Sequence, residues 1–436
     1  MAGLRPSSPW DGGASSTGKR GYSVMTSVSR KRNRSRLLTF VLGGAALAIV
    51  IGIVQAPREA FSASLSGLEI WWQYVFPGLI PPLILAELLA ASGMLHGLAV
   101  LAEPLTRSWF RLPGASGWAI AFGWTAGFPA GAKETARLRE SGLIRDEHTD
   151  KALLVSHVPN PFLVVAIVGA GFLQSPALGW AIAAGVWLAA IAAGVVWSRM
   201  GARQLEPDKP DEIRGSGRMN KALRAAAEAR LADRRPLGKQ LADAVTNTIG
   251  TLMSIGGLMM MAAVVIRLLQ SWIPGSDAWI AVPGVYEMNL GAYATSRSPL
   301  FESSPEQASA LLAAALAWTG WSGLLQARAA FAGAGVFPWG KLIAGKLLQS
   351  ALALLITWPL ARFALRLDEQ PTAWPSGSFS FDFTASSPAV WSDWRGWPQA
   401  WLAGLACLAV FLLLALIAAL IRPRTKRRGG PPPFAK

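Results

Sequence analysis

Residues 67–94 read GLEIWWQYVFPGLIPPLILAELLAASGM, an almost uncharged stretch that is long enough to enter a lipid bilayer. Pro77, Pro81 and Pro82 lack backbone N–H groups, so we expect them to break a helix here. Non-helical backbone at membrane depth survives only where protein buries it or where it lines a cavity. Glu87 follows in an otherwise apolar half-helix, and an intramembrane carboxylate is a functional candidate because it is costly to place there. The alternative is a protonated or paired structural glutamate.

The composition of the whole chain also indicates a membrane protein. Of 436 residues, 52% are hydrophobic and 15% are charged, against about 25% charged in soluble domains. The formal net charge is +16, but the basic residues cluster between long apolar runs, which favours a lipid bilayer over nucleic acid as the partner. Cys407, His96, His148 and His157 form no disulfide or zinc pattern. We therefore expect no metal site and no cofactor, and interpret the histidines as ordinary hydrogen-bonded side chains.

Several apolar stretches have the length of transmembrane helices. Three of them are clean spans, at residues 37–54, 177–198 and 400–421. The first follows a basic run, but its 18 apolar residues without a small-residue cleavage site indicate a retained anchor. The others are interrupted by Pro, Gly or single polar residues, at residues 68–93, 115–132, 152–173, 241–271, 281–295, 307–327 and 338–365.

The charges of the polar segments predict the orientation of the chain. Residues 1–36 carry eight Lys or Arg and one acid, residues 199–240 carry eleven and six, and residues 422–436 carry six and none. All three segments, and hence both termini, are expected in the cytoplasm. Residues 366–399 carry two Arg and four acids, which places them on the opposite side. We interpret 199–240 as a solvated tether, with contact to anionic lipid head groups as the alternative.

This orientation divides the chain into eight parts. They are a basic cytoplasmic tail (1–36), the first transmembrane helix and a connection (37–66), a first repeat (67–198), a basic cytoplasmic linker (199–240), a second repeat (241–365), an extracytoplasmic loop (366–399), a last transmembrane helix (400–421) and a basic cytoplasmic tail (422–436). The two repeats cross the membrane in opposite directions, and GWTAGFPA from Gly123 aligns with GWSGLLQA from Gly320. The predicted fold class is an all-α polytopic membrane protein with two inverted repeats of broken or re-entrant helices, an architecture of many secondary transporters.

The segment GWTAGFPAGAKETARLRESG (123–142) is a candidate gate. Gly123, Gly127 and Gly131 are spaced by four, which permits close approach between membrane helices. Pro129 interrupts the segment and frees backbone groups to meet a ligand. The spacing differs from that of a phosphate-binding P-loop, and no strand precedes it.

The segment SHVPNP (156–161) is a second interruption. Its prolines favour an extended elbow, at which Ser156 and Asn160 offer donors and acceptors to a polar solute or a cation. Ser156 beside His157 does not match a hydrolase site, because it lacks a GxSxG elbow and a third member. We predict no catalytic residue and no enzyme activity, since no nucleophile or acid–base pair is evident.

Two stretches of the second repeat carry further polar candidates. VPGVYEMNLGAYA (282–294) is short for a span and places Glu287 and Asn289 in a segment typical of a re-entrant turn. GWSGLLQARAAF, which begins at Gly320, carries Ser322 and Gln326. The alternative for these polar residues is interhelical packing, worth about 1 kcal/mol each.

Together these stretches resemble the YlbJ family of sporulation integral membrane proteins, which carry the nucleoside recognition or Gate domain. The likeness rests, in family order over residues 67–350, on GLEIWWQYVFPGLIPPLILAELL, EPLTRSWFRLPG, GWTAGFPAGAK with ETARLRESG, SHVPNP, PGVYEMNLGA and GWSGLLQARAAF. The resemblance implies a membrane protein needed for resistant spores, located in the mother-cell or forespore membrane, and distantly similar to concentrative nucleoside transporters. It implies no substrate. Tyr293 stands where the family has a lysine, which leaves Asn160, Glu287 and Gln326 as the residues to carry over.

Our leading hypothesis is a transporter-like protein that moves or senses a small polar solute or ion. Its binding residues are predicted to be Glu87, Pro129, Ser156, Asn160, Glu287, Asn289, Ser322 and Gln326. Its structural gate is predicted to consist of Pro77, Pro81, Pro82, Gly123, Gly127 and Gly131. The rival hypothesis is a non-transporting scaffold or regulator of spore envelope (cortex) assembly. Either protein could contact other sporulation membrane proteins or a second copy of itself.

Overall fold

A computed structural model describes residues 39–200, 217–273 and 283–368 of the chain, which divides into two compact units, residues 1–61 and 62–436. In the first unit the described part is an exposed apolar helix, Thr39–Gln55, and the residues that follow it to 61. Several predicted parts lie outside the described residues: the tail 1–36, residues 369–399 of the loop, the span 400–421 with Cys407, and the tail 422–436.

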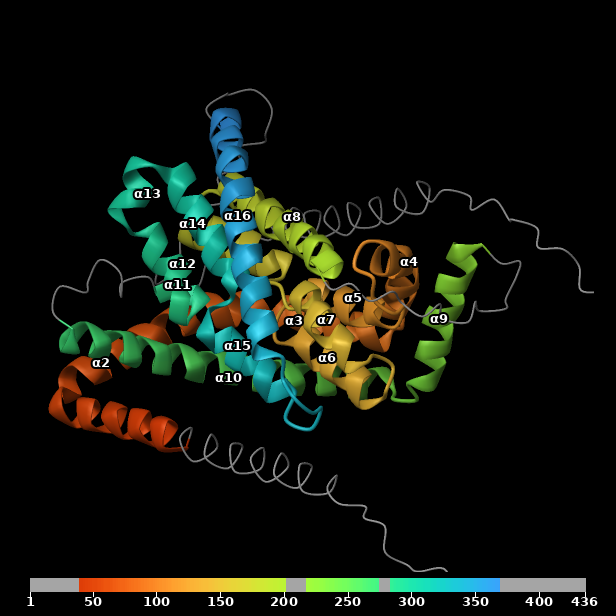
Figure 1. Ribbon diagram of the computed structural model, residues 1–436, viewed down its shortest axis with the longest axis horizontal. Helices are drawn as coiled ribbons and strands as arrows, with labels where there is room; N and C mark the ends of the chain where they lie inside the picture. The colour runs from red at the N-terminus through yellow and green to blue at the C-terminus, as the bar shows by residue number, and fades with distance from the viewer. Residues whose placement is uncertain (1–38, 201–216, 274–282, 369–436) are drawn as a thin grey trace, which may run out of the picture. The chain divides into compact units, whose positions relative to one another are not determined.

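The regular elements of the described residues are all helical (Figure 1). In chain order after the first helix they are α2 (Pro57–Ile70), η1 (Trp71–Val75), α3 (Phe76–Ala91), α4 (Met94–Ser108), α5 (Ser116–Ala126), α6 (Ala130–Glu140), α7 (Asp146–Ser156), η2 (Leu163–Phe172), α8 (Pro176–Met200), α9 (Arg218–Ala232), α10 (Leu237–Trp272), α11 (Pro283–Tyr286), α12 (Met288–Ser296), α13 (Pro299–Ser303), α14 (Pro305–Trp318), α15 (Gly320–Ala330) and α16 (Trp339–Asp368). The segments η1 and η2 are π-helical.

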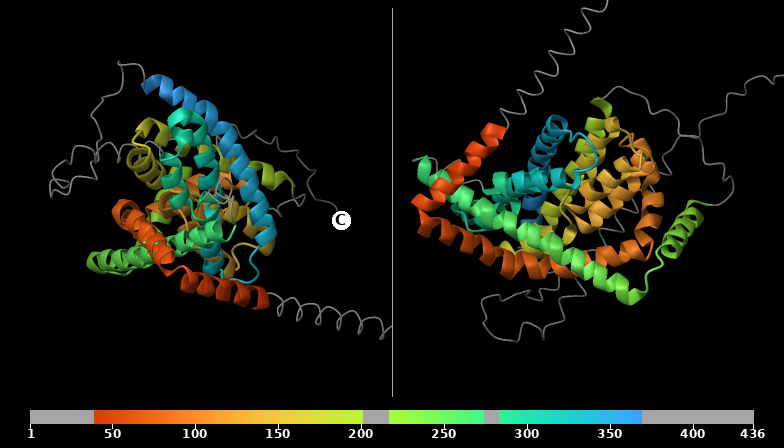
Figure 2. Two further views of the ribbon diagram at one scale, coloured as in Figure 1. Left: turned by 90° about the vertical axis from the view of Figure 1, so that its left-hand side faces the viewer. Right: turned by 90° about the horizontal axis from the view of Figure 1, so that it is seen from below.

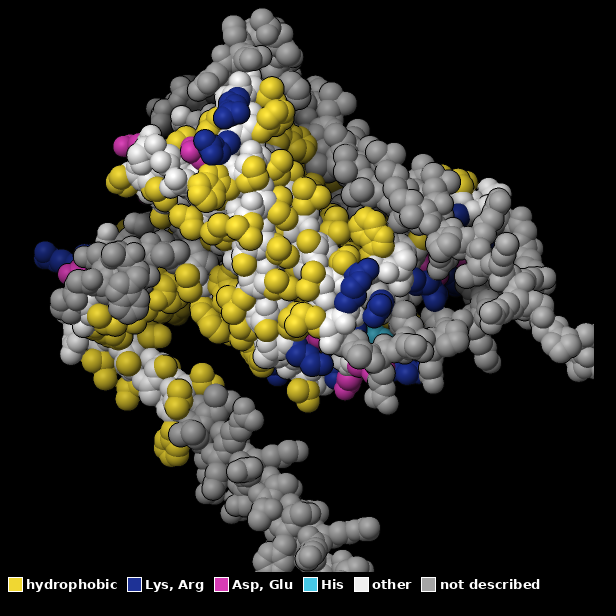
Figure 3. Space-filling model, turned by 45° about the horizontal axis from the view of Figure 1, so that its top comes forward, with side chains coloured by type: hydrophobic (Ala, Val, Ile, Leu, Met, Phe, Trp, Pro, Cys, Tyr) yellow, Lys and Arg dark blue, Asp and Glu magenta, His cyan; other side chains and the backbone are white. Residues whose placement is uncertain are grey.

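Five helical stretches of the described chain are long and apolar enough to cross a membrane. They are Pro57–Ala91, Pro176–Met200, Leu237–Trp272, Pro305–Ala330 and Trp339–Leu367. Hydrophobic side chains are spread over the central described part of the face in Figure 3, where few charged side chains are seen. These features confirm an all-α polytopic membrane protein.

Four interruptions divide apolar segments into shorter helices, and one of them lies inside the stretch Pro305–Ala330. Residues 127–129 separate α5 from α6, residues 157–160 separate α7 from the helical turn before η2, Glu287 separates α11 from α12, and Thr319 separates α14 from α15. The predicted broken helices are therefore present at 115–132, 152–173 and 281–295. The two aligned stretches differ in relation to their breaks, because residues 123–130 span the break between α5 and α6, while residues 320–327 lie entirely within α15.

The expected break at Pro77, Pro81 and Pro82 is not there. The helix runs from Pro57 to Ala91 without interruption, and Pro81 and Pro82 lie inside α3. A proline ring clashes with the carbonyl four residues earlier, which for Pro77 is the carbonyl of Gln73. Gln73 lies in the π-helical turn η1, and the wider turn of a π-helix relieves this clash.

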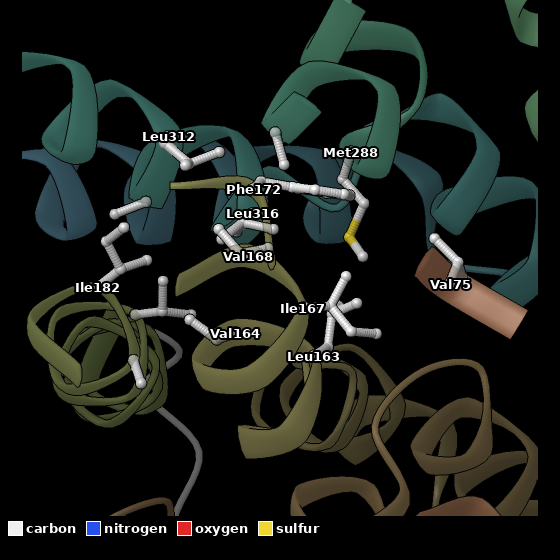
Figure 4. Close-up of a cluster of buried hydrophobic side chains, with 14 of the residues drawn as sticks. Val75, Leu163, Val164, Ile167, Val168, Phe172, Ile182, Met288, Leu312 and Leu316 are labelled. Carbon is white, nitrogen blue, oxygen red and sulfur yellow. The ribbon is translucent and has the colours of Figure 1, made fainter. Parts of the chain in front are cut away.

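The hydrophobic core of the second unit joins helices from both halves of the sequence. Val164 and Val168 of η2 face Ile182 of α8 and Leu312 and Leu316 of α14 (Figure 4). A Cβ atom on Gly169 would overlap the backbone of Gly179, so glycine at both positions lets η2 and α8 pack closely. The long helix α16 packs along α8 and α14, as the views in Figure 2 also show.

Candidate functional site

A small cavity lies where interruptions from both halves of the sequence meet. It is lined by Leu79, Leu83, Ala126, Gly127, Phe128, Asn160, Leu163, Ile255, Met288 and Asn289. Eight of these residues are apolar, and the two amide side chains come from different halves. The lining is mostly apolar with two polar groups, and the cavity volume of about 10 Å³ is close to that of one water molecule.

The first wall of the cavity is the α5–α6 break. Gly127 follows the last residue of α5 with φ of 80°, a left-handed value that favours glycine. A Cβ atom on Gly127 would lie 3.0 Å from the backbone nitrogen of Asn160, so a larger residue would push the elbow away. Phe128 lines the cavity, and Pro129 immediately before α6 shapes this turn without lining the cavity.

The second wall is the elbow between α7 and η2. Asn160 is 4% exposed, and both ends of its side chain are bonded to the backbone. Its Nδ2 atom donates to the carbonyl of Ala126 over 3.0 Å, and its Oδ1 atom accepts from the Leu163 amide over 2.7 Å. Asn160 therefore caps the start of η2 and also ties it to the end of α5.

Ser156 lies beside the elbow but not in the cavity. Its hydroxyl is 3.0 Å from the Thr135 hydroxyl and donates to the carbonyl of Gly131 over 3.3 Å. A Cβ atom on Gly123 or Gly131 would overlap the Ser156 carbonyl oxygen. The three residues therefore pack α5, α6 and α7 backbone to backbone, a structural role.

The third wall is the break at Glu287, in the second half of the chain. Glu287 is 3% exposed, and its carboxylate accepts from the Leu290 amide over 2.7 Å and from Asn289 Nδ2 over 2.9 Å. It therefore caps α12 and orients the Asn289 side chain. The Asn289 Oδ1 atom is buried and has no hydrogen-bond partner among the described residues. One of the residues that line the cavity thus carries an acceptor without a partner among the described residues.

Three predicted residues lie away from the cavity lining. Glu87, on α3, is near Lys133 and Arg137 on the charged face of α6. Ser322 is buried within α15. The Oε1 atom of Gln326, also on α15, is buried without a hydrogen-bond partner among the described residues. The structure therefore brings together Asn160, Glu287 and Asn289 and leaves these three apart.

A polar cluster next to the elbow was not predicted. Lys346 is fully buried in the membrane-length helix α16, and its ammonium donates to the carbonyl of His157 over 2.5 Å and to Gln349 Oε1 over 3.0 Å. No carboxylate of the described residues forms an ion pair with it. A lone lysine inside the apolar run LIAGKLLQSALALLIT was the sequence signal, because an intramembrane charge marks a candidate site.

His157 differs from the ordinary hydrogen-bonded histidine that we expected. Its side chain is fully buried, and neither ring nitrogen has a hydrogen-bond partner among the described residues. The reason is its surroundings, because the ring faces Phe128 at 5.4 Å between centroids and lies close to Gly323. The Ser156 hydroxyl bonds elsewhere, so the two residues form no nucleophile–base pair. Within the described residues, no three His, Cys, Asp or Glu side chains could hold a metal ion.

The remaining break packs against the third wall. A Cβ atom on Gly320 would lie 2.9 Å from the Tyr286 carbonyl oxygen and 3.1 Å from the Cα atom of Glu287. Trp318 donates its indole N–H to the carbonyl of Val285 over 3.1 Å. All four interruptions therefore lie around one centre, which the cavity and the Lys346 cluster occupy.

Comparison with known proteins gives one informative relative. The chain is 36% identical over 237 residues to the sporulation integral membrane protein YlbJ of Bacillus subtilis strain 168. The match covers 54% of this chain and 58% of the relative, so the chain spans little more than half of the relative's length. No family model and no solved structure matches. The match confirms the resemblance to the YlbJ family that the motifs indicate.

Proposed function

We propose, from this resemblance and from the cavity, that the chain is a sporulation membrane protein of transporter-like Gate fold. It moves or senses a small polar solute or ion across the mother-cell or forespore membrane and is needed for resistant spores. Both termini and the 199–240 linker are cytoplasmic in this proposal. The two halves, 67–198 and 241–365, are inverted Gate repeats that move against each other around the cavity.

One observation carries the proposal. Breaks from both halves of the chain meet at a single cavity, and each half supplies one amide side chain to it. Broken helices at membrane depth are tolerated where they line a cavity, and binding at the junction of two repeats is typical of secondary transporters.

The free acceptor indicates the chemistry of the solute. A buried amide oxygen without a partner costs about 1–3 kcal/mol. A solute that donates an N–H or O–H group, or a cation, would remove that cost at Asn289 Oδ1. Both polar side-chain atoms of Asn160 are hydrogen-bonded to the backbone. In the proposal Asn160 therefore holds the elbow in place beside the solute and does not bind the solute itself. Glu287 holds Asn289 in place.

Movement of the halves requires a contact that can open. The Lys346 ammonium of the second half holds the His157 carbonyl of the first half. This bond joins α16 to the elbow that carries Asn160. In the proposal this hydrogen bond breaks or lengthens when the cavity opens to one side of the membrane. The bond is therefore present in the closed state and absent in the open state. Glu87, Ser322 and Gln326 act outside the cavity, along the faces of α3 and α15.

Uptake by proteoliposomes tests the proposal. The full chain and vesicles without protein are compared with a panel of radiolabelled polar solutes, nucleosides included. Asn289→Ala and Glu287→Gln are expected to abolish the uptake that the full chain shows, and Glu87→Gln is expected to lower it less. Asn247→Ala, on the exposed surface of α10, is the matched control. Equal flux with and without protein for every solute would overturn transport.

A second test uses the relative's own cell. The chain is expressed in a Bacillus subtilis strain that lacks YlbJ, and heat-resistant spores are counted. We expect restoration by the full chain and not by Asn289→Ala. Restoration by both would favour the second candidate, a scaffold or regulator of cortex assembly. The observation that favours this candidate is Asn160, whose polar atoms are all bonded within the protein, as packing residues are.

A further inference from the structure

Part of the predicted tether is a helix that packs on the membrane-embedded unit. Helix α9 lies beside α4 (Figure 1). A Cβ atom on Gly93 would overlap the backbone of Ala226, and one on Gly97 would lie 3.1 Å from the Ala222 carbonyl oxygen. These close contacts use one side of α9 and fix the helix in place. It is therefore not a solvated tether over residues 218–232.

Next to this contact side, α9 carries an exposed apolar row. Met219, Leu223 and Leu231 are 59%, 61% and 78% exposed. With Ala227 they are spaced by four residues, so they form one row along the helix. No element of the described chain covers this row, and three large exposed apolar side chains on a basic segment need a non-aqueous neighbour.

The charges beside this row are basic. Arg224 and Arg230 flank the row, and Arg218 and Lys221 lie at the start of the helix. None of the four forms an ion pair with a described residue. Glu228 is the one acidic residue of α9. An apolar row flanked by unpaired basic side chains is the pattern of a helix that lies in a membrane surface.

The corner between α9 and α10 sets the direction of α9. In Figure 1, α9 stands upright beside the end of the nearly horizontal α10, and α10 is long and apolar enough to span a membrane. Arg235 lies at the corner and binds Asp233 and Asp243 at 2.8 Å each. The Arg235 guanidinium lowers the pKa of Asp233 to about 2, so this corner keeps its charges at physiological pH.

We propose that α9 is an interfacial helix that binds an anionic lipid surface, with Met219, Leu223 and Leu231 at the acyl boundary and the basic side chains at the head groups. Cytoplasmic leaflets carry anionic lipids, and the linker is predicted to be cytoplasmic. The proposal does not depend on transport.

A fluorescent label at Leu223 tests this contact in the full chain. In a Cys407→Ser background, Leu223→Cys carries an environment-sensitive dye, and the protein is placed in nanodiscs of phosphatidylcholine with or without phosphatidylglycerol. We expect blue-shifted emission and quenching by brominated lipid in the anionic discs. Glu228→Cys, about 140° around the helix from Leu223 at 100° per residue, is the matched control and is expected to stay in water.

Charge removal tests the anionic part of the proposal. The double variant Arg224→Gln with Arg230→Gln is expected to lower the ratio of lipid-bound to lipid-free α9 about thirtyfold. The estimate follows because each basic side chain near an anionic surface contributes about 1 kcal/mol. Lys341→Gln with Arg366→Gln, both exposed on α16, is the control and is expected to leave the ratio unchanged. A water-like signal from the dye at position 223 in both kinds of nanodisc overturns the proposal. That signal is expected if the row instead binds a protein partner or a second copy of the chain. An equal lipid signal in both discs overturns the anionic specificity.

Discussion

The two breaks that face the cavity use the same residue type in different ways. In the first half, Asn160 bonds both ends of its side chain to backbone groups. In the second half, Asn289 donates to Glu287 and leaves its Oδ1 atom without a partner among the described residues. At the first break both polar atoms of the asparagine side chain are paired with the backbone, while at the second break the asparagine has an acceptor without a partner among the described residues. In the proposed function, the first half therefore supplies a rigid wall and the second half supplies the binding atom.

The largest loss of stability is expected at Gly123, where α5 contacts the backbone of Ser156. Gly123→Ala places a methyl group against the Ser156 carbonyl, and overpacking against backbone that cannot move is expected to cost about 3 kcal/mol or more. The measurement is the thermal midpoint of the purified protein in nanodiscs. Gly257→Ala, on α10, meets nothing within 4 Å and is the matched control. A Gly123→Ala variant as stable as this control would show that the first break is not rigid.

The next effect concerns the bond that joins the two halves. Lys346→Met removes the donor to the His157 carbonyl and to Gln349, and two unsatisfied buried acceptors are expected to cost about 2–3 kcal/mol. Thermal unfolding measures the loss, and the exposed Lys341→Met is the control. If Lys346→Met instead unfolds at a higher temperature, relief of the buried charge outweighs the lost bonds, and Lys346 does not hold the elbow.

A smaller effect tests whether Asn160 is a structural cap. Asn160→Ala removes the cap of η2 and the bond to Ala126, at about 1 kcal/mol each. Asn160→Asp keeps the acceptor for the Leu163 amide but places an oxygen against the Ala126 carbonyl in a buried site, so it is expected to be no more stable than Asn160→Ala. If both variants keep full stability and lose solute binding, Asn160 is a ligand residue and the contrast between the two breaks disappears.

The smallest change in stability is expected at the free acceptor. Asn289→Leu removes an unsatisfied oxygen and one bond to Glu287, so the net change is expected to be below about 1 kcal/mol. Solute uptake and spore resistance are nevertheless expected to be lost. Normal uptake by this variant would place the binding atom elsewhere, and Gln326 Oε1 would be the next candidate.

Comparison of particular residues shows how far sequence reasoning reached. The polar interruptions at Asn160 and Glu287 are predicted from the sequence, because proline, glycine and polar groups inside an apolar run have few structural explanations. Glu87 was singled out by the same logic, yet it lies near the charged face of α6. Position along a helix does not tell which neighbour a side chain meets, because that depends on the packing of the next helix.

The residues alone were enough to establish that the chain is helical, that it enters lipid and that its helices are interrupted. Hydrophobicity, charge clustering and proline act locally, so their consequences can be read along the chain. Two outcomes required the folded arrangement: Lys346 reaches the carbonyl of His157, and one asparagine is bonded while the other has an acceptor without a partner among the described residues. These outcomes depend on contacts between segments far apart in the chain, such as the 189 positions that separate His157 from Lys346.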